Sequence, residues 1–299
     1  MPLLAPGRAP FSAGQGCTST LVPARACDCH VHVYDASYPA VSGARLTPDD
    51  ACVADYRQVQ RRTGTERAVF VTPSTYGTDN RPMLAGLAEF GDQGRGVAVI
   101  GHDISDHALD ALHAAGVRGV RLNLSLGVGT DAGQIQPLAA RIAGAGWHLQ
   151  LLASPDLLFS LKDTLRQLPV PLVLDHFARL RPSMVDRHPA HALVLSLLGE
   201  GRAWVKLSGG YIVTEQGPPD YGDLQDLAQS YLQAAPGRVL WGSDWPHASA
   251  TAGHQALPDD ARQMDLLASW AHDAGTLQRV LVDNPAELYG FSSTSDGMR

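Results

Sequence analysis

Three short segments of the chain bring histidines and aspartates together at spacings that could support chemistry. The first reads Asp28-Cys29-His30-Val31-His32, the second Asp175-His176, and the third Gly242-Ser243-Asp244-Trp245-Pro246-His247. Imidazole and carboxylate groups exchange protons near neutral pH and also bind divalent metals. The same set could therefore serve acid–base catalysis or hold Zn²⁺.

The elements that must position these segments follow from the hydrophobic pattern. Short apolar runs alternate with longer helix-like segments, which indicates repeated strand–helix units around a parallel sheet. The predicted strands are 26–33, 67–72, 97–102, 117–124, 147–152, 171–176, 203–208 and 238–243. The predicted helices are 50–63, 79–91, 105–115, 131–145, 154–167, 188–200, 222–235 and 258–273.

About eight such units without a break in composition predict an α/β fold, a single (β/α)8 TIM barrel over residues 26–299. Residues 1–25 are expected to form an irregular N-terminal arm, and residues 277–291 a C-terminal helix that packs on the barrel. A doubly wound open sheet is the alternative. No G-x-G-x-x-G follows the first strand, which weakens that alternative.

Composition excludes several other classes of protein. The chain has 299 residues and a formal net charge of −7, with 44% hydrophobic and 18% charged residues. A disordered chain, a nucleic-acid partner and a membrane partner are therefore not expected. Four cysteines clustered near the N-terminus do not suit a disulfide scaffold, so we expect a cytoplasmic protein.

In a barrel the functional side chains lie at the carboxyl ends of the strands, where all three segments fall. Strict alternation would place Asp28, His30 and His32 on one face of the first strand. It would place Cys27, Cys29 and Val31 on the other face, with the cysteines packed outward under the helices. Lys206 is expected to point into the barrel and to pair with Asp28 or a similar acid.

These motifs resemble the amidohydrolase superfamily, in its amidohydrolase-2 branch, from about residue 26 to residue 290. The likeness includes the three segments above and the tail Asp283-Asn284-Pro285-Ala286-Glu287-Leu288-Tyr289. Within the branch the chain is most similar to the 2-pyrone-4,6-dicarboxylate lactonases and related lactonases. That likeness is carried by Ser74-x-x-Gly77-Thr78-Asp79-Asn80, by Gly116-Val117-Arg118-Gly119-Val120-Arg121-x-Asn123 and by Lys206-x-Ser208-Gly209.

The resemblance implies a hydrolase that opens a lactone ring, a lactonase with no cofactor. Asp244 is the expected base that activates water, and His30, His32 and His176 are expected to polarise the carbonyl and protonate the leaving oxygen. The candidate substrate-binding residues are Arg121, Asn123, Ser74, Gln150, Ser208, Tyr211 and His247.

A metal-free site is expected because the fourth strand ends in Arg121 and Asn123, where metal-dependent relatives carry a further ligand. A guanidinium beside a metal would be repulsive. If a metal is present, its ligands are expected to be His30, His32 and Asp244 around Zn²⁺.

The expected substrate is a mono-carboxylate lactone or a sugar-acid lactone. The lactonase relatives clamp two carboxylates with several arginines, and Arg121 matches one of them. This chain has Gly127 and Ile212 where two others are expected, so a dicarboxylate pyrone is disfavoured.

Three other functions remain open at this stage. They are a zinc-dependent decarboxylase or hydrolase of the same branch, a lactone isomerase, and a ligand-binding barrel without catalysis. A homodimer is compatible with the class.

Overall fold

Eight parallel strands form the centre of the molecule, and the computed structural model describes residues 8–125 and 131–292. The strands are β1 (Cys27–Val31), β2 (Arg67–Val71), β3 (Gly94–Ala98), β4 (Val117–Asn123), β5 (His148–Leu152), β6 (Leu172–Leu174), β7 (Ala203–Leu207) and β8 (Val239–Trp241). They pair in chain order from β1 to β8. A parallel bridge between Val31 and Trp245 joins the two ends, so the predicted barrel is confirmed.

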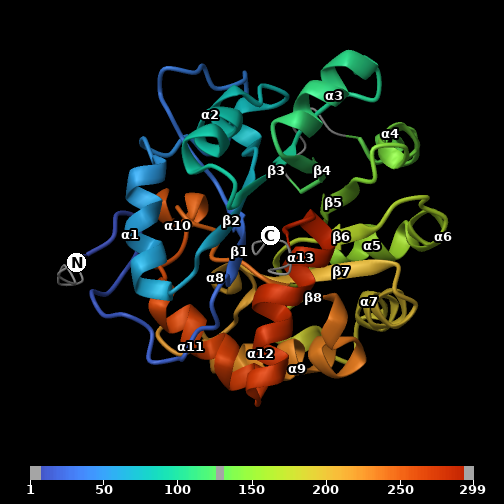
Figure 1. Ribbon diagram of the computed structural model, residues 1–299. Helices are drawn as coiled ribbons and strands as arrows, with labels where there is room; N and C mark the ends of the chain where they lie inside the picture. The colour runs from blue at the N-terminus through green and yellow to red at the C-terminus, as the bar shows by residue number, and fades with distance from the viewer. Residues whose placement is uncertain (1–7, 126–130, 293–299) are drawn as a thin grey trace, which may run out of the picture.

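Helices surround the strands on all sides (Figure 1). They are α1 (Val53–Thr63), α2 (Arg81–Phe90), α3 (Asp106–Ala114), α4 (Ile135–Ala143), α5 (Pro155–Ser160), α6 (Lys162–Arg166), α7 (Pro189–Gly199), α8 (Gly210–Val213), α9 (Gln225–Ala234), α10 (Ala248–Thr251), α11 (Asp260–Ala271), α12 (Ala274–Gln278) and α13 (Asn284–Tyr289). Short 3-10 turns are η1 (Ser74–Tyr76), η2 (Ala132–Gln134), η3 (His176–Arg179), η4 (Pro182–Met184), η5 (Gly222–Leu224) and η6 (Pro236–Arg238), and one π-helical turn is η7 (Arg279–Asp283).

Alternation along the strands separates two layers of core. Val205 and Leu207 of β7 belong to the large cluster that joins the strands to the helices. Trp204 instead belongs to a smaller cluster that fills the inside of the barrel. Lys206 has the same parity as Trp204 and is fully buried, so it points into the barrel as predicted.

The third strand starts three residues earlier and ends four residues earlier than the sequence predicts, at Gly94–Ala98 rather than 97–102. Glycine has a low β-strand propensity, so the strand is not recognised from its residues. The packing against α2 nevertheless requires these glycines. A Cβ at Gly94 would come within 2.7 Å of Leu87 in α2, and one at Gly96 within 3.0 Å of Met83. His102 therefore lies beyond the strand, exposed, with its Nδ1 atom 2.7 Å from Gln134 Oε1.

The first strand contains a bulge that overturns part of the predicted facing. Asp28 pairs with Ala68 and Val31 with Phe70, so β1 has one residue more than β2 over this stretch. Asp28 and Val31 face the helices, and Tyr56 of α1 donates to Asp28 Oδ2 at 3.1 Å.

The prediction that the cysteines of this strand face outward is wrong. Cys27 and Cys29 belong to the cluster inside the barrel. Because the bulge adds one residue after Cys29, the next side chain, His30, also turns inward. The histidines keep the shared face that was predicted, but they share it with the cysteines rather than with Asp28.

The N-terminal arm and α13 pack against different parts of the barrel. Tyr289 of α13 joins the cluster inside the barrel, and α13 lies over its centre in the view of Figure 1. The arm over residues 8–25 has no helix or strand. It runs beside the segment after β8, where the Trp245 indole donates to the Pro10 carbonyl at 2.9 Å. No helix among the described residues is long and apolar enough to span a membrane.

Candidate active site

Four side chains converge at the carboxyl ends of β1, β6 and β8. His30 Nε2 lies 3.2 Å from His32 Nε2, and both lie close to Asp244 Oδ1, at 3.5 and 3.6 Å. His176 Nε2 lies 3.8 Å from the same carboxylate oxygen. All four side chains are almost fully buried. The structure thus brings together every residue that the sequence proposed as catalytic.

Unusual backbone conformations place two of these residues. His176 has φ 51° and Asp244 has φ 68°, a left-handed region that non-glycine residues rarely adopt. Strain of this kind is maintained only where the surrounding structure fixes it, and it concentrates at functional sites. Gly242 is required nearby, because a Cβ there would lie 2.7 Å from His30 Cβ.

A second polar layer lies inside the barrel beneath the four residues. Asp175 Oδ2 accepts a hydrogen bond from Arg121 Nε at 3.0 Å and another from Gln150 Nε2 at 3.1 Å. Lys206 Nζ donates to Gln150 Oε1 at 2.7 Å and lies 3.8 Å from Asp175 Oδ1. The acid that pairs with Lys206 is therefore Asp175, whereas Asp28 accepts a hydrogen bond from Tyr56 on the helix side of β1.

Asp175 and Asp244 are both stabilised as carboxylates. Burial raises the pKa of Asp175, but His30, Arg121 and Lys206 face it and hold that pKa well below its ordinary value. Burial also raises the pKa of Asp244, and the three surrounding histidines outweigh this effect, so that this pKa too is lowered. Asp244 is therefore ionised at neutral pH.

The imidazoles of His30 and His176 are shifted toward their neutral forms. Burial lowers the pKa of His30 well below its ordinary value and also lowers the pKa of His176, although Asp175 and Asp244 oppose the change. Burial likewise lowers the pKa of Lys206, and the nearby Asp175 carboxylate opposes it. Neutral rings next to a carboxylate can both donate and accept protons, as acid–base catalysis requires.

A cavity of about 430 Å³ opens above these residues. Arg121, Asn123, Ser74 and Tyr211 line it, as the sequence predicts for substrate-binding residues. Tyr211 also donates from its hydroxyl to Asp244 Oδ2 at 2.6 Å, which leaves Oδ1 facing the histidines.

Three other predicted substrate-binding residues do not line this cavity. Gln150 lies in the layer below it, and Ser208 is buried with its hydroxyl 2.9 Å from His176 Nδ1. His247 is fully buried and its Nε2 lies 3.2 Å from Asp260. Gly127, used in the specificity argument, lies outside the described residues, whereas Ile212 lines the cavity.

Sequence reasoning missed three arginines that also line the cavity, Arg45, Arg179 and Arg181. Arg179 follows three residues after His176 and could have been found by asking what the turn after the sixth strand carries. Arg45 lies in the long loop after β1, where no motif marks it. His254 lines the cavity as well.

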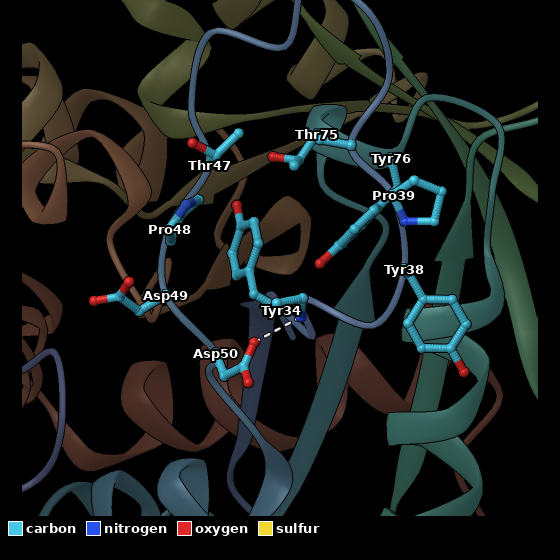
Figure 2. Close-up of a pocket in the computed structure, with 11 residues that line it drawn as sticks. Tyr34, Tyr38, Pro39, Thr47, Pro48, Asp49, Asp50, Thr75 and Tyr76 are labelled. Carbon is cyan, nitrogen blue, oxygen red and sulfur yellow. Dashed lines mark hydrogen bonds between the residues drawn. The ribbon is translucent and has the colours of Figure 1, made fainter.

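The cavity shares lining residues with two other cavities. Tyr34 and Thr75 line it and also line a second hollow, shown in Figure 2, where Tyr34 stands between the segment 47–50 and Tyr76. A third cavity of about 530 Å³ shares Ser74, Arg121 and Asn123 with it. Asn123 Nδ2 donates to Ser74 Oγ at 2.8 Å where these two cavities meet.

The donor set also fits a divalent metal. One ligand atom from each of His30, His32 and Asp244 lies within 4.8 Å of the others, and two imidazoles with one carboxylate suit Zn²⁺. These residues would hold such an ion, which when bound would polarise a carbonyl or acidify water. A second group with this spacing, His30, Asp175 and His176, shares one histidine with the first.

Comparison with known proteins shows the family and the same fold. An amidohydrolase family profile matches residues 27–291. The chain is 34% identical over 280 residues to a 2-pyrone-4,6-dicarboxylate hydrolase of Comamonas testosteroni, covering 90% of this chain and 91% of that protein. It is 31% identical to a 4-sulfomuconolactone hydrolase of Rhizobium radiobacter, covering 91% and 92%. A ligand-free crystal structure of an Agrobacterium tumefaciens protein superposes with a TM-score of 0.84 at 27% identity, covering 92% of this chain and 99% of that one.

Proposed function

This chain belongs to the amidohydrolase family, and we propose that it is a metal-independent lactonase in which Asp244 activates water. The observation that carries the proposal is the convergence of His30, His32 and His176 on one oxygen of the Asp244 carboxylate, at the floor of a cavity. Relatives that share about a third of its residues are named as hydrolases of lactones.

In the proposed reaction Asp244 removes a proton from water as the water oxygen bonds to the lactone carbonyl carbon. Charge then develops on the carbonyl oxygen, where donors on the cavity wall stabilise it. His176 is suited to carry a proton, because its Nδ1 atom faces the Ser208 hydroxyl and its Nε2 atom faces Asp244. As the ring C–O bond breaks, the proton passes to the leaving oxygen, and a hydroxy acid results.

The charge balance beneath the cavity supports a mechanism without metal. Asp175 and Asp244 carry two negative charges, and Arg121 and Lys206 supply two positive ones within the same buried region. A divalent ion would add two positive charges to a group in which these cations, with Arg179 beside them, already offset the carboxylates. Unbalanced charge away from water is costly, so the residues present favour protons over a metal.

We propose that the substrate is a lactone with one carboxylate or a neutral sugar-acid lactone. Arg121 and the half-buried Arg179 line the cavity together with Arg45 and Arg181, and guanidinium groups pair well with carboxylates. Ile212, another of the lining residues, offers no charge to a second carboxylate. The acid formed by ring opening would add one further negative charge near these arginines.

A panel of neutral, mono-carboxylate and dicarboxylate lactones, monitored with a pH indicator, tests this function. We expect kcat/KM to be greatest for a mono-carboxylate and about 10- to 100-fold lower for a neutral lactone, since one charged hydrogen bond contributes about 1.5–3 kcal/mol. Greater activity on a dicarboxylate would contradict the argument from Ile212. Failure to open any lactone would contradict the function itself.

Two further measurements on the same samples separate the alternatives. Product analysis by NMR distinguishes a ring-opened acid from a rearranged lactone, so an isomerase would be recognised directly. Elemental analysis and chelator treatment address the metal. Stoichiometric zinc together with chelator-sensitive activity would contradict the metal-independent mechanism and favour a zinc-dependent hydrolase or decarboxylase.

The dependence of kcat/KM on pH should be flat from pH 8 down past the ordinary imidazole pKa of 6.5. Burial lowers the pKa of His30 and of His176, so both rings stay neutral as the pH falls through that value. Asp244 stays ionised because its pKa is also lowered. The profile of kcat/KM reports the free enzyme. An acid limb centred near pH 6.5 would show that a histidine of ordinary pKa controls the reaction.

A further inference from the structure

The four arginines that line the active-site cavity differ in what already balances their charge. Arg121 is buried and donates from Nε to Asp175 Oδ2 at 3.0 Å, so a buried carboxylate faces it. Arg45 and Arg181 are exposed, and water screens the charge of an exposed guanidinium. Arg179 is half-buried, so its charge is neither fully exposed to water nor held by Asp175.

Among residues 8–125 and 131–292, the Arg179 guanidinium has no hydrogen-bond partner and no carboxylate within 4 Å. Burial lowers the pKa of Arg179, and the like charge of Arg181 lowers it further, whereas the more distant Asp244 opposes both effects. A guanidinium nevertheless stays charged in a protein. Because a charge that is withdrawn from water without a close partner is unfavourable, an anion bound beside Arg179 would be stabilised.

The backbone holds Arg179 at the wall of the cavity. The four residues of η3, from His176 to Arg179, have φ values of 51°, 55°, 55° and 58°, a region that residues other than glycine rarely adopt. Packing behind the turn maintains this conformation, since Phe177 and Ala178 are buried in the core and the Tyr231 hydroxyl donates to the Phe177 carbonyl at 3.0 Å. The turn therefore fixes the start of the Arg179 side chain three residues after His176.

The cavity suits a small ring that carries one anionic group. Its volume is about 430 Å³, and among the described residues that line it Asp244 is the one carboxylate. That carboxylate already accepts the Tyr211 hydroxyl and faces the histidines, so it does not pair with Arg179. A planar carboxylate matches the two parallel N–H donors of a guanidinium, which a neutral hydroxyl group does not.

We propose that Arg179 binds the carboxylate substituent of the lactone, so that the preferred substrate is a mono-carboxylate lactone rather than a neutral sugar-acid lactone. The inference rests on the lactonase function proposed above and identifies the side chain that selects between its two substrate classes. Arg121 would have to share its charge with Asp175, and the exposed Arg45 and Arg181 are screened by water. Arg179 therefore contributes the largest part of the selectivity.

The first measurement is the binding of cyclopentanecarboxylate, a small ring acid that cannot be hydrolysed, to the full-length protein by calorimetry. We expect Arg179→Gln to weaken this binding by about 10- to 100-fold, the range for loss of a hydrogen bond to a charged group. Equal affinity in the wild type and the variant would overturn the proposal. Absence of binding to the wild type would overturn it as well.

The neutral probe cyclopentanecarboxamide separates loss of charge recognition from loss of structure. The wild type should bind it about 10- to 100-fold more weakly than the carboxylate, and Arg179→Gln should bind it as the wild type does. A wild type that bound both probes equally would contradict the proposal even if the variant did not fold. Equal loss of both probes in a folded variant would show that Arg179 only shapes the cavity.

Steady-state kinetics separates a carboxylate-binding role from stabilisation of the reacting carbonyl oxygen. Arg179→Gln should raise KM for a mono-carboxylate lactone by about 10- to 100-fold and leave kcat within about threefold, because the contact is made equally in the ground state and the transition state. Its kcat/KM for a neutral lactone should be that of the wild type. A large decrease in kcat for both lactones would place Arg179 at the carbonyl oxygen and overturn the proposal.

The matched control is Arg187→Gln, the same change at an exposed arginine between η4 and α7. It should bind both probes as the wild type does, and an effect as large as that of Arg179→Gln would contradict the proposal. The binding measurements use no lactone. A chain that opened no lactone could therefore still show the Arg179 effect, and a lactonase could still fail to show it.

Discussion

Asp244→Asn should lower kcat for lactone opening by about 10²- to 10⁴-fold while the lactone still binds. Asp244 is the one carboxylate among the four converging side chains, and it is ionised at neutral pH because the three histidines hold its pKa below the ordinary value. Removal of a general base costs about 10²- to 10⁴-fold in rate. The amide has nearly the same shape and can still accept the hydroxyl of Tyr211. The measurement is a comparison of kcat with the dissociation constant of the lactone by calorimetry.

A suitable control for this variant is Asp110→Asn, which makes the same chemical change at an exposed position of α3. It should have wild-type activity. If Asp244→Asn kept a tenth or more of the wild-type kcat, the base would have to be another group. If lactone binding were lost together with activity, the carboxylate would be needed for binding, and its role as base would not be supported.

The second large effect is on stability. Asp175→Asn should lower the free energy of unfolding by about 3–5 kcal/mol, because it removes the carboxylate that faces Arg121 and Lys206 inside the barrel. The amide can keep the hydrogen bonds from Arg121 and Gln150 but cannot balance two buried cations. Denaturant titration of the wild type and the variant measures the difference.

The pH dependence of that difference has a definite sign. The pKa of Asp175 in the folded protein lies well below its ordinary value of 3.8, so its contribution to stability is complete above that value. The contribution decreases as the pH falls through the folded pKa. The gap between wild type and variant should therefore be full at pH 7 and narrow only below about pH 4. The exposed Asp110→Asn should change stability by less than about 0.5 kcal/mol at either pH.

The barrel and the cluster of His30, His32, His176 and Asp244 could be predicted from the sequence because each depends on local patterns. Apolar runs alternating with helical segments specify strand–helix units, and parallel strands present their carboxyl ends at one edge. His30 lies near the end of β1, and His176 and Asp244 follow the ends of β6 and β8, so their convergence follows from topology. No distance between them had to be known in advance.

What the sequence could not provide depends on contacts between distant segments. Gly94 and Gly96 are poor strand formers, and only the close approach of α2 explains why β3 uses them. Arg45 reaches the cavity from a long loop whose course no periodicity describes. The pairing of Lys206 with Asp175 rather than Asp28 depends on which way each strand residue faces, and strict alternation gave the wrong facing for Asp28.

The single extra residue in β1 has a consequence for anyone who would transplant this site. On a regular strand the sequence Asp-Cys-His-Val-His would direct its aspartate and both histidines to the same side. Here the aspartate anchors the strand from behind through Tyr56 and the Ser243 amide. If the motif Asp-Cys-His-Val-His were copied onto another barrel without the bulge, its aspartate would turn to the inner face of the strand. The hydrogen bonds that hold the strand from the helix side would then be lost. A transfer of this site to another protein therefore requires both the motif and the β-bulge.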